Sequence, residues 1–202
     1  MKLYFNPASP FARKVAVVLA ETGQSGAVEI VNVAGHPTDS GTMPLSQNPL
    51  GKLPTLVRDD GPAIYDSRVI CRYLNDIGKG HLYPTSPRQW ETLTLEATGD
   101  GIMDAAILMV YETRSRPEDK HDPAWVEGQW AKVTRALDAL EERWMAHLAG
   151  PLDIGIISVA CALGYLDFRQ PGQDWRATRP ALAAWFAAIG ARDSFADTAP
   201  QA

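Results

Sequence analysis

The strand signals of this sequence all lie in its first 65 residues, and their position restricts the fold more than any other feature. Short runs of β-branched and aromatic residues occur at residues 2–6, 28–33, 53–57 and 63–65. After a connector rich in glycine and proline, only helix-type periodicity remains. We therefore expect two domains: an α/β domain over residues 1–78 and an all-α helical bundle domain over residues 86–202.

The expected order of elements in the front domain is βαβ-ββα. An apolar-periodic run, 11–22, follows the first strand, and right-handed crossover geometry places the second strand parallel to the first. The turn sequence Asp59-Asp60-Gly61 lies between two short apolar runs and predicts a β-hairpin. Asp66-Ser67 then precedes a last helix that ends near Ile77. The sheet is thus expected to be mixed.

The rear domain is expected to contain four helices. Their expected ranges are 88–114, 123–149, 153–169 and 180–191. The third is apolar on most sides, which is typical of the central helix of a bundle.

The charge balance and the cysteines narrow the class of protein. Nineteen basic and twenty-four acidic side chains are interspersed and give a net charge of -5, so we expect no nucleic-acid or anionic-membrane partner. No segment predicts a signal peptide or a transmembrane helix. Cys71 and Cys161 lie among aliphatic residues at helical spacing, which indicates buried thiols in the cytoplasm. The scattered histidines predict no metal site.

Ser9 is the first candidate functional residue. It stands between a strand and a helix N-terminus, where free backbone N–H groups and the positive end of the helix dipole favour an anion such as a thiolate. The alternative is that Ser9 only caps the helix, and this motif alone favours capping.

Lys52, Leu53 and Pro54 form the second candidate. Pro54 stands where a loop enters a strand, and a cis peptide bond before it would explain its place. The backbone N–H and C=O of Leu53 would then face outward and could pair with an extended peptide. Lys52 would offer a cation to a carboxylate. The alternative is an ordinary loop with a surface lysine.

Asp66 and Ser67 form the third candidate, at the start of the next helix. The Asp66 carboxylate would bind an ammonium group, and the hydroxyl and N–H of Ser67 would bind a carboxylate. These are the two charged groups of an amino acid. Plain helix capping is again the alternative.

In their order and spacing, the three segments together resemble the glutathione S-transferase family. The resemblance extends to residues 100–105, 160–169 and 193–198, which are similar to bacterial members of the serine-type branch. It implies a thioredoxin-like front domain, glutathione as co-substrate, no metal and a homodimer.

The resemblance also implies a role for each segment. Ser9 would hydrogen-bond the glutathione sulfur, and Leu53 would pair with the cysteinyl unit. Lys52 would meet the glycyl carboxylate, while Asp66 and Ser67 would hold the γ-glutamyl end. A hydrophobic electrophile would lie between the domains, near side chains of a kind that on bundle helices more often belong to the core: Phe11, Met103, Ile107, Tyr165 and Phe168.

Two positions depart from the family pattern. Many relatives have Glu where Asp66 stands, which implies weaker binding by the shorter side chain. Many relatives also begin the central rear helix with Ser or Thr followed three residues later by Asp. Here Ile156 follows Asp153, so Asp153 can cap the helix but lacks the reciprocal acidic partner.

The implied activity is conjugation, in which the glutathione thiolate attacks an electrophilic carbon. Ala8 and Ser9 contain no sulfur, so glutathione-dependent peroxidase or reductase chemistry ranks lower. A non-catalytic glutathione-binding scaffold protein is the alternative from another class.

Overall fold

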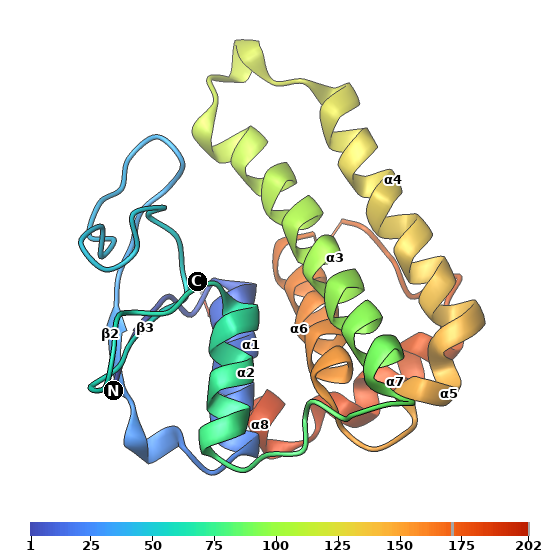
Figure 1. Ribbon diagram of the computed structural model, residues 1–202. Helices are drawn as coiled ribbons and strands as arrows, with labels where there is room; N and C mark the ends of the chain where they lie inside the picture. Colours follow the sequence, from blue (N-terminus) through green and yellow to red (C-terminus); the bar gives the residue numbers. More distant parts are fainter. Residues whose placement is uncertain (171, 202) are drawn as a thin grey trace.

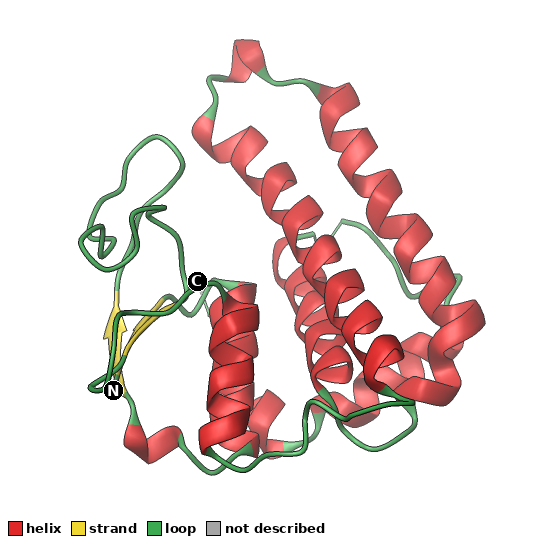
Figure 2. Ribbon diagram, viewed as in Figure 1, coloured by secondary structure: helices red, strands yellow, loops and turns green. Residues whose placement is uncertain are grey.

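The computed structural model describes residues 1–170 and 172–201. Two parts lie side by side, a small sheet with two helices and a group of longer helices (Figures 1 and 2). The first part contains, in chain order, β1 (Lys2–Phe5), α1 (Pro10–Glu21), the 3-10 turn η1 (Ser25–Ala27), β2 (Glu29–Asn32), β3 (Thr55–Val57) and α2 (Ser67–Ile77).

The sheet is mixed, as the sequence predicts. β1 lies in the centre, with β2 parallel to it and β3 antiparallel to it. Leu3 of β1 pairs with Ile30 on one side and with Leu56 on the other. Helices α1 and α2 cover one face of this sheet (Figure 1), and Leu3 and Leu56 are fully buried.

The predicted fourth strand is reduced to a single bridge. Leu56 and Ile64 exchange two backbone hydrogen bonds, of 3.0 and 2.9 Å, and within the described residues the pairing extends no further. Pro62 has no N–H to lengthen the ladder on one side. On the other side the chain turns into α2, which Asp66 caps. Residues 63–65 therefore contribute one bridge to the sheet and do not form a strand.

The second part is helical, as predicted. It contains α3 (Gln89–Ser115), the 3-10 turn η2 (Glu118–Lys120), α4 (Pro123–Ala139), the π-helical turn η3 (Leu140–Trp144), α5 (Met145–Leu148), α6 (Ile154–Arg169), α7 (Pro180–Gly190) and α8 (Asp193–Ala196). The sequence predicts one helix over 123–149, which the π-helical turn interrupts. It predicts neither α8 nor the 3-10 turns, since such short elements give no periodic signal.

None of the described helices has the length and apolarity to span a bilayer. The domain boundary between residues 78 and 86 stays a prediction.

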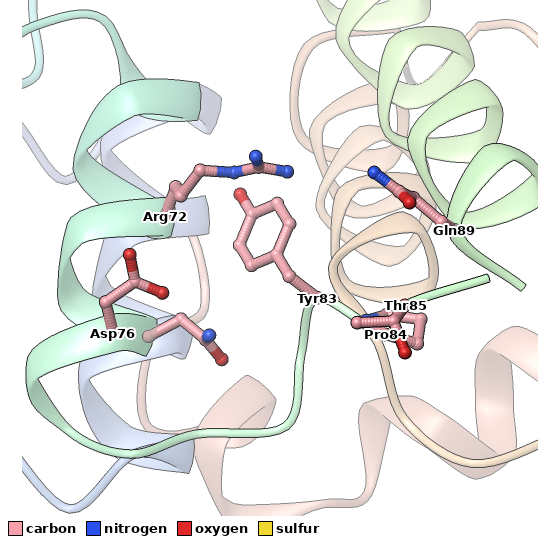
Figure 3. Close-up of a pocket in the computed structure, with 7 residues that line it drawn as sticks. Arg72, Asp76, Tyr83, Pro84, Thr85 and Gln89 are labelled. Carbon is pink, nitrogen blue, oxygen red and sulfur yellow. The ribbon is translucent and has the colours of Figure 1, made fainter.

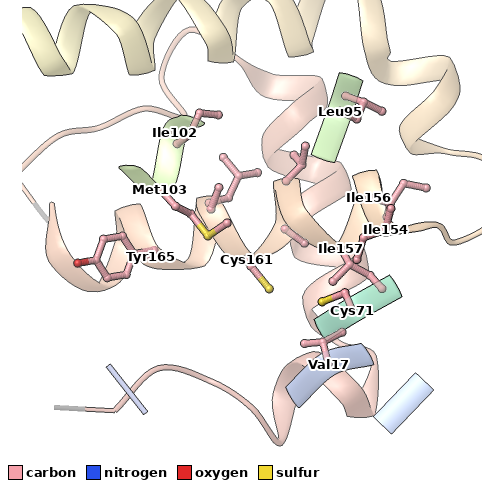
Figure 4. Packing of buried hydrophobic residues seen from close by; sticks show 14 of the residues in the cluster. Val17, Cys71, Leu95, Ile102, Met103, Ile154, Ile156, Ile157, Cys161 and Tyr165 are labelled. Atoms are coloured by element: carbon pink, nitrogen blue, oxygen red, sulfur yellow. The ribbon is translucent and has the colours of Figure 1, made fainter. Parts of the chain in front are cut away.

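Helix α6 is the centre of the core, as its all-round apolarity predicts. Every residue from Ile154 to Leu166 is buried. Helix α3 crosses it closely at Gly99, where a Cβ atom would lie 2.6 Å from the backbone carbon of Ser158. The apolar cluster continues into the first part of the chain, and Figure 4 shows side chains of α1, α2 and α3 packed around α6. Cys71 and Cys161 are free thiols, and the prediction that both are buried is confirmed.

Asp153 caps α6, although its reciprocal acidic partner is missing. Its Oδ1 accepts a hydrogen bond of 3.0 Å from the N–H of Ile156. Its Oδ2 accepts from Thr92 Oγ1 (2.7 Å) and Arg88 Nη2 (3.1 Å), and lies 2.8 Å from His147 Nε2. Side chains from outside the helix therefore stabilise the cap. His147 is largely buried rather than a surface group.

Candidate functional site

Ser9 lies at the N-terminus of α1, directly after the loop that leaves β1. Its Oγ accepts a hydrogen bond of 3.3 Å from the N–H of Ala12, and its own N–H donates to the Asn6 carbonyl at 2.9 Å. Pro10 occupies the first helical position, where no backbone donor is needed. The capping prediction is confirmed. The Ser9 side chain is half-buried, so solvent still reaches it.

Capping leaves the hydroxyl hydrogen of Ser9 available. A hydroxyl group has one donor and two acceptor lone pairs, and the bond from Ala12 occupies one lone pair. No acceptor in residues 1–170 and 172–201 takes the hydroxyl hydrogen. The two interpretations of Ser9 are therefore compatible, because the oxygen can cap the helix while the hydrogen is donated to an anion.

A buried asparagine holds the segment 52–54 in place. Asn48 is 1% exposed, and its Nδ2 donates to the Lys52 carbonyl (2.9 Å) and to Thr55 Oγ1 (3.0 Å). The Leu53–Pro54 peptide bond is cis, as expected. Within the described chain, the N–H and C=O of Leu53 have no hydrogen-bond partner, and the Lys52 side chain is exposed. This segment therefore offers a free backbone edge beside a cation.

Asp66 caps α2 and pairs with Arg68. Its Oδ1 accepts the backbone N–H of Arg68, and its Oδ2 lies 3.0 Å from Arg68 Nη2. Partial burial acts to raise the pKa of Asp66, but the hydrogen bonds from Arg68 outweigh it and hold that pKa below its ordinary value. The carboxylate is 54% exposed, so an anionic oxygen stays accessible to a cation. Ser67 is buried at the first position of α2.

A buried charge cluster lies behind these segments and joins α1 to α3. Lys14 Nζ is 2.6 Å from Asp100 Oδ1 and 3.3 Å from Glu96 Oε1. Burial acts to lower the pKa of Lys14, but the attraction of Asp100 and Glu96 is stronger and raises it, so Lys14 is an ammonium. Arg68 Nε approaches Asp100 Oδ2 at 3.7 Å. Arg68 therefore links the exposed Asp66 to this buried cluster.

The side chains expected near a second substrate fall into a buried group and a half-buried group. Met103 and Tyr165 are buried, with 0% and 4% of their surface exposed. Phe11, Ile107 and Phe168 are half-buried and pack against the same apolar cluster. In Figure 4 the hydroxyl of Tyr165 points away from that cluster.

A surface hollow lies away from all these residues (Figure 3). Its volume is about 210 Å³, and α2, the connecting segment and the start of α3 line it, through Arg72, Asn75, Asp76, Tyr83, Pro84, Thr85 and Gln89. None of the candidate site residues contributes to it. The part of the chain that the structure describes contains no group of three or more His, Cys, Asp or Glu side chains suited to a metal ion.

Comparison with known proteins identifies the family of this chain. A family model for the glutathione S-transferase N-terminal domain matches residues 8–77, and one for the C-terminal domain matches residues 123–188. The uncharacterized GST-like protein YibF of Escherichia coli is 33% identical over 99% of this chain and 98% of its own length. The chain belongs to the glutathione S-transferase family. The resemblance to this family stated from the sequence is thereby confirmed, whereas its assignment to the serine-type branch stays a prediction.

Solved structures of family members are similar over the whole chain. A glutathione transferase family member from Pseudomonas fluorescens with bound glutathione has a TM-score of 0.96 and 45% identity, over 100% of this chain and 99% of that chain. A structure from the same organism with bound S-(propanoic acid)-glutathione has a TM-score of 0.91 and 45% identity, over 100% of both chains. A glutathione S-transferase from Methylobacillus flagellatus with glutathione bound has a TM-score of 0.87 and 38% identity, over 99% of both chains.

Sequence reasoning missed the residues that support the site from behind. Asn48 precedes a proline in a loop, and its role appears only in the folded backbone that it spans. Lys14 follows Arg13 in an otherwise apolar helical run, and a cation there indicates a buried ion pair without naming its partners. The partner acids Glu96 and Asp100 are spaced i, i+4 on α3, which is the signal that could have identified them.

Proposed function

We propose that the protein is a glutathione transferase in which Ser9 donates a hydrogen bond to the glutathione sulfur. The observation that supports this role is the uncommitted hydroxyl hydrogen of Ser9 at the N-terminus of α1. A free thiol has a pKa of about 8.5, and each unit of lowering corresponds to about 1.4 kcal/mol. One hydrogen bond to a charged acceptor, worth about 1.5–3 kcal/mol, could lower that pKa enough to make the thiolate abundant at neutral pH.

The other site segments would hold the rest of the tripeptide. The free N–H and C=O of Leu53 would pair with the cysteinyl backbone, in the manner of an added strand. Lys52 would bind the glycyl carboxylate. Asp66 would bind the γ-glutamyl ammonium, and Ser67 at the helix start would bind the γ-glutamyl carboxylate.

The reaction that follows is conjugation to a hydrophobic electrophile. The thiolate sulfur forms a bond to an electrophilic carbon. In a substitution, the leaving group departs with the electron pair of the broken bond. In an addition to a double bond, solvent protonates the resulting carbanion. The compound bound to the Pseudomonas fluorescens relative, S-(propanoic acid)-glutathione, carries an organic group on the glutathione sulfur, which supports this reaction class here.

The buried cysteines disfavour a redox reaction that uses a protein thiol. Burial raises the pKa of Cys71 far above its ordinary value, and burial raises the pKa of Cys161 to about 11. A peroxidase or reductase activity would therefore use glutathione itself as the reductant. A panel of chloronitroaromatic, enal and hydroperoxide substrates separates these activities from each other and from a non-catalytic scaffold.

The deciding experiment is a titration of the thiolate absorbance of bound glutathione in the parent and in Ser9→Ala. We expect the apparent pKa of the bound thiol to be about 1–2 units higher in the variant. Asp122→Ala is the matched control, because Asp122 caps α4 in the same way but lies outside the site. Equal pKa values in the parent and in Ser9→Ala would remove Ser9 from this role.

The proposed assembly is a cytoplasmic homodimer. Val69 on α2 and Trp90 on α3 are large apolar side chains, 49% and 67% exposed, and each neighbours residues that line the hollow of Figure 3. We assign these two side chains to the contact of the dimer that the family resemblance implies. Light scattering should give twice the chain mass for the parent and the chain mass for Trp90→Glu. A dimeric variant would assign the contact to another face.

A further inference from the structure

Two arginines at the C-terminal ends of α3 and α6 have no carboxylate partner among the residues that the structure describes. Arg114 lies in the last turn of α3, and Arg169 is the last residue of α6. Within residues 1–170 and 172–201, no carboxylate lies within ion-pair distance of either guanidinium, and Arg169 Nε is buried without a hydrogen-bond partner. We call this pair the arginine rim.

A direct contact joins α1, which Ser9 caps, to α6, which carries Arg169. One turn after Ser9, the guanidinium of Arg13 packs directly on Gly164 of α6, where any Cβ atom would collide with it. Tyr165 is the next residue of the same helix, and Arg169 follows five residues after Gly164. In Figure 1 the N-terminal end of α1 and the C-terminal end of α6 are the upper ends of these two helices, and α3 continues upward beyond both.

Two aromatic side chains, Phe168 and Tyr165, lie at the Arg169 end of the rim. The guanidinium carbon of Arg169 lies 4.0 Å from the centroid of the Phe168 ring, and the rings of Tyr165 and Phe168 are 6.5 Å apart. Stacking on a ring face leaves the edge of a guanidinium, with its N–H groups, free to bind a planar anion. Burial raises the pKa of Tyr165 to about 12 although Arg169 and Arg114 oppose this shift, so its hydroxyl stays protonated and can donate.

Three acidic side chains of α3 and α6 interact with cations other than Arg114 and Arg169. Glu112 on α3 is buried and lies 3.0 Å from Arg116. Asp167 on α6 binds Arg176. Asp104 on α3 is close enough to Lys52 and Arg68 to be influenced by both, and so lies at the glutathione end. None of these three carboxylates pairs with a guanidinium of the rim.

We propose that the arginine rim binds an acidic group of the second substrate, so that the electrophile is a carboxylate-bearing apolar molecule. Arg169 would bind the carboxylate and Arg114 would add attraction, while the apolar body would lie against Phe11 and Phe168. This inference rests on the proposed conjugation at Ser9. Planar guanidinium groups match carboxylates with two parallel hydrogen bonds, which gives the site its selectivity.

The test compares two electrophiles of similar size and shape, the charged 4-chloro-3,5-dinitrobenzoate and the neutral 4-chloro-3,5-dinitrobenzamide. The value of kcat/KM for each is divided by its uncatalysed rate constant with glutathione, which removes intrinsic reactivity. We expect Arg169→Gln to lower the benzoate-to-benzamide ratio about tenfold, the effect of losing one charged hydrogen bond. Arg143→Gln is the matched control, since Arg143 is exposed on the π-helical turn. An unchanged ratio in Arg169→Gln overturns the proposal.

A binding measurement keeps this result separate from the proposed catalytic function. Calorimetry compares S-(2-carboxyethyl)glutathione with S-(2-carbamoylethyl)glutathione, neither of which needs turnover. Tighter binding of the carboxyethyl conjugate by the parent, lost in Arg169→Gln, supports the rim even if no substrate is turned over. Equal affinities overturn the rim and leave the glutathione site standing. Failure of glutathione itself to bind overturns the proposed function and this inference together.

Discussion

The ammonium of Lys14 and the carboxylate of Asp100 lie 2.6 Å apart, and both are buried. Lys14 belongs to α1, which packs on the sheet, whereas Asp100 belongs to the helical part of the chain. Ser158 Oγ donates to the same carboxylate at 2.9 Å, so α6 joins the contact. One ion pair thus ties together three helices behind the glutathione segments, and through Arg68 it reaches Asp66.

Replacing Lys14 should destabilise the protein strongly. Lys14→Met leaves the buried carboxylates of Asp100 and Glu96 without their cation, and removing one partner of a buried pair costs about 3–5 kcal/mol. Urea unfolding measures the loss. Lys2→Met is the control, because Lys2 pairs with Glu29 on the surface and should cost less than about 1 kcal/mol. Similar small losses in both variants would contradict the structural role of Lys14.

Two glycines of α3 should respond in opposite directions to alanine. A Cβ atom at Gly99 would lie 2.6 Å from the backbone of Ser158, so Gly99→Ala should cost about 1–3 kcal/mol by forcing α3 and α6 apart. A Cβ atom at Gly101 meets nothing within 4 Å, so Gly101→Ala should stabilise the helix by about 0.5–1 kcal/mol. Thermal unfolding of both variants measures the contrast, and equal shifts would mean that the crossing tolerates a methyl group.

The two aspartate caps should differ in their effect on stability. Asp122→Ala removes an exposed cap of α4 and should cost about 1 kcal/mol. Asp153→Ala also deprives the buried Thr92 hydroxyl and His147 of their acceptor, so about 2–4 kcal/mol is expected. Urea unfolding again measures the difference. A loss in Asp153→Ala no larger than that in Asp122→Ala would show that the side-chain contacts contribute little.

Asp66 should matter only for ligands that carry the γ-glutamyl group. Asp66→Asn removes the negative charge but keeps a capping oxygen, so we expect glutathione to bind about tenfold more weakly, the loss of one charged contact. Cysteinylglycine lacks the γ-glutamyl unit and should bind both proteins equally. Calorimetry with the two ligands checks this, and an equal loss for both would point to a general distortion of the site.

The sequence predicts the elements that give strong periodic or capping signals. The apolar residues of α6 place it in the core, and Ser9, Asp66 and Asp153 stand at the helix starts that they cap. The bridge at Ile64 could not be distinguished from a strand, because three residues before a helix give no usable alternation. The segment is too short for its pattern to show whether it forms a strand or a single bridge.

The contacts that support the site could not be predicted in the same way. The bond of Lys14 to Asp100 joins residues 86 positions apart, and one sequence does not state which buried acid meets which buried base. The burial of the second-substrate side chains could not be predicted either. Met103 and Ile107 follow one helical pattern, and only the packing of the fold shows that Met103 is fully buried. Local signals therefore predict elements, whereas distances across the core require the fold.

The contact between α1 and α8 should make stability sensitive to acid. Glu21 accepts hydrogen bonds from Arg192 Nε (2.6 Å) and Nη2 (2.7 Å), and these bonds hold the pKa of Glu21 below its ordinary value despite partial burial. Because the folded pKa is lowered, this stabilisation is fully present above the ordinary carboxyl pKa of about 4.3 and is lost as the pH falls through the folded value. The free energy of unfolding of the parent should therefore exceed that of Glu21→Gln at about pH 7, and the difference should shrink toward about pH 3.

The matched control for this pH dependence is Glu29→Gln, because Glu29 is exposed and pairs with Lys2 at 3.5 Å on the surface. Surface pairs of this kind contribute little, so its difference from the parent should stay small at every pH. Urea unfolding at a series of pH values measures both variants. A difference for Glu21→Gln that stays constant from neutral to acid pH would mean that α8 is held by the packing of Phe195, which is 2% exposed, and not by the charge on Glu21.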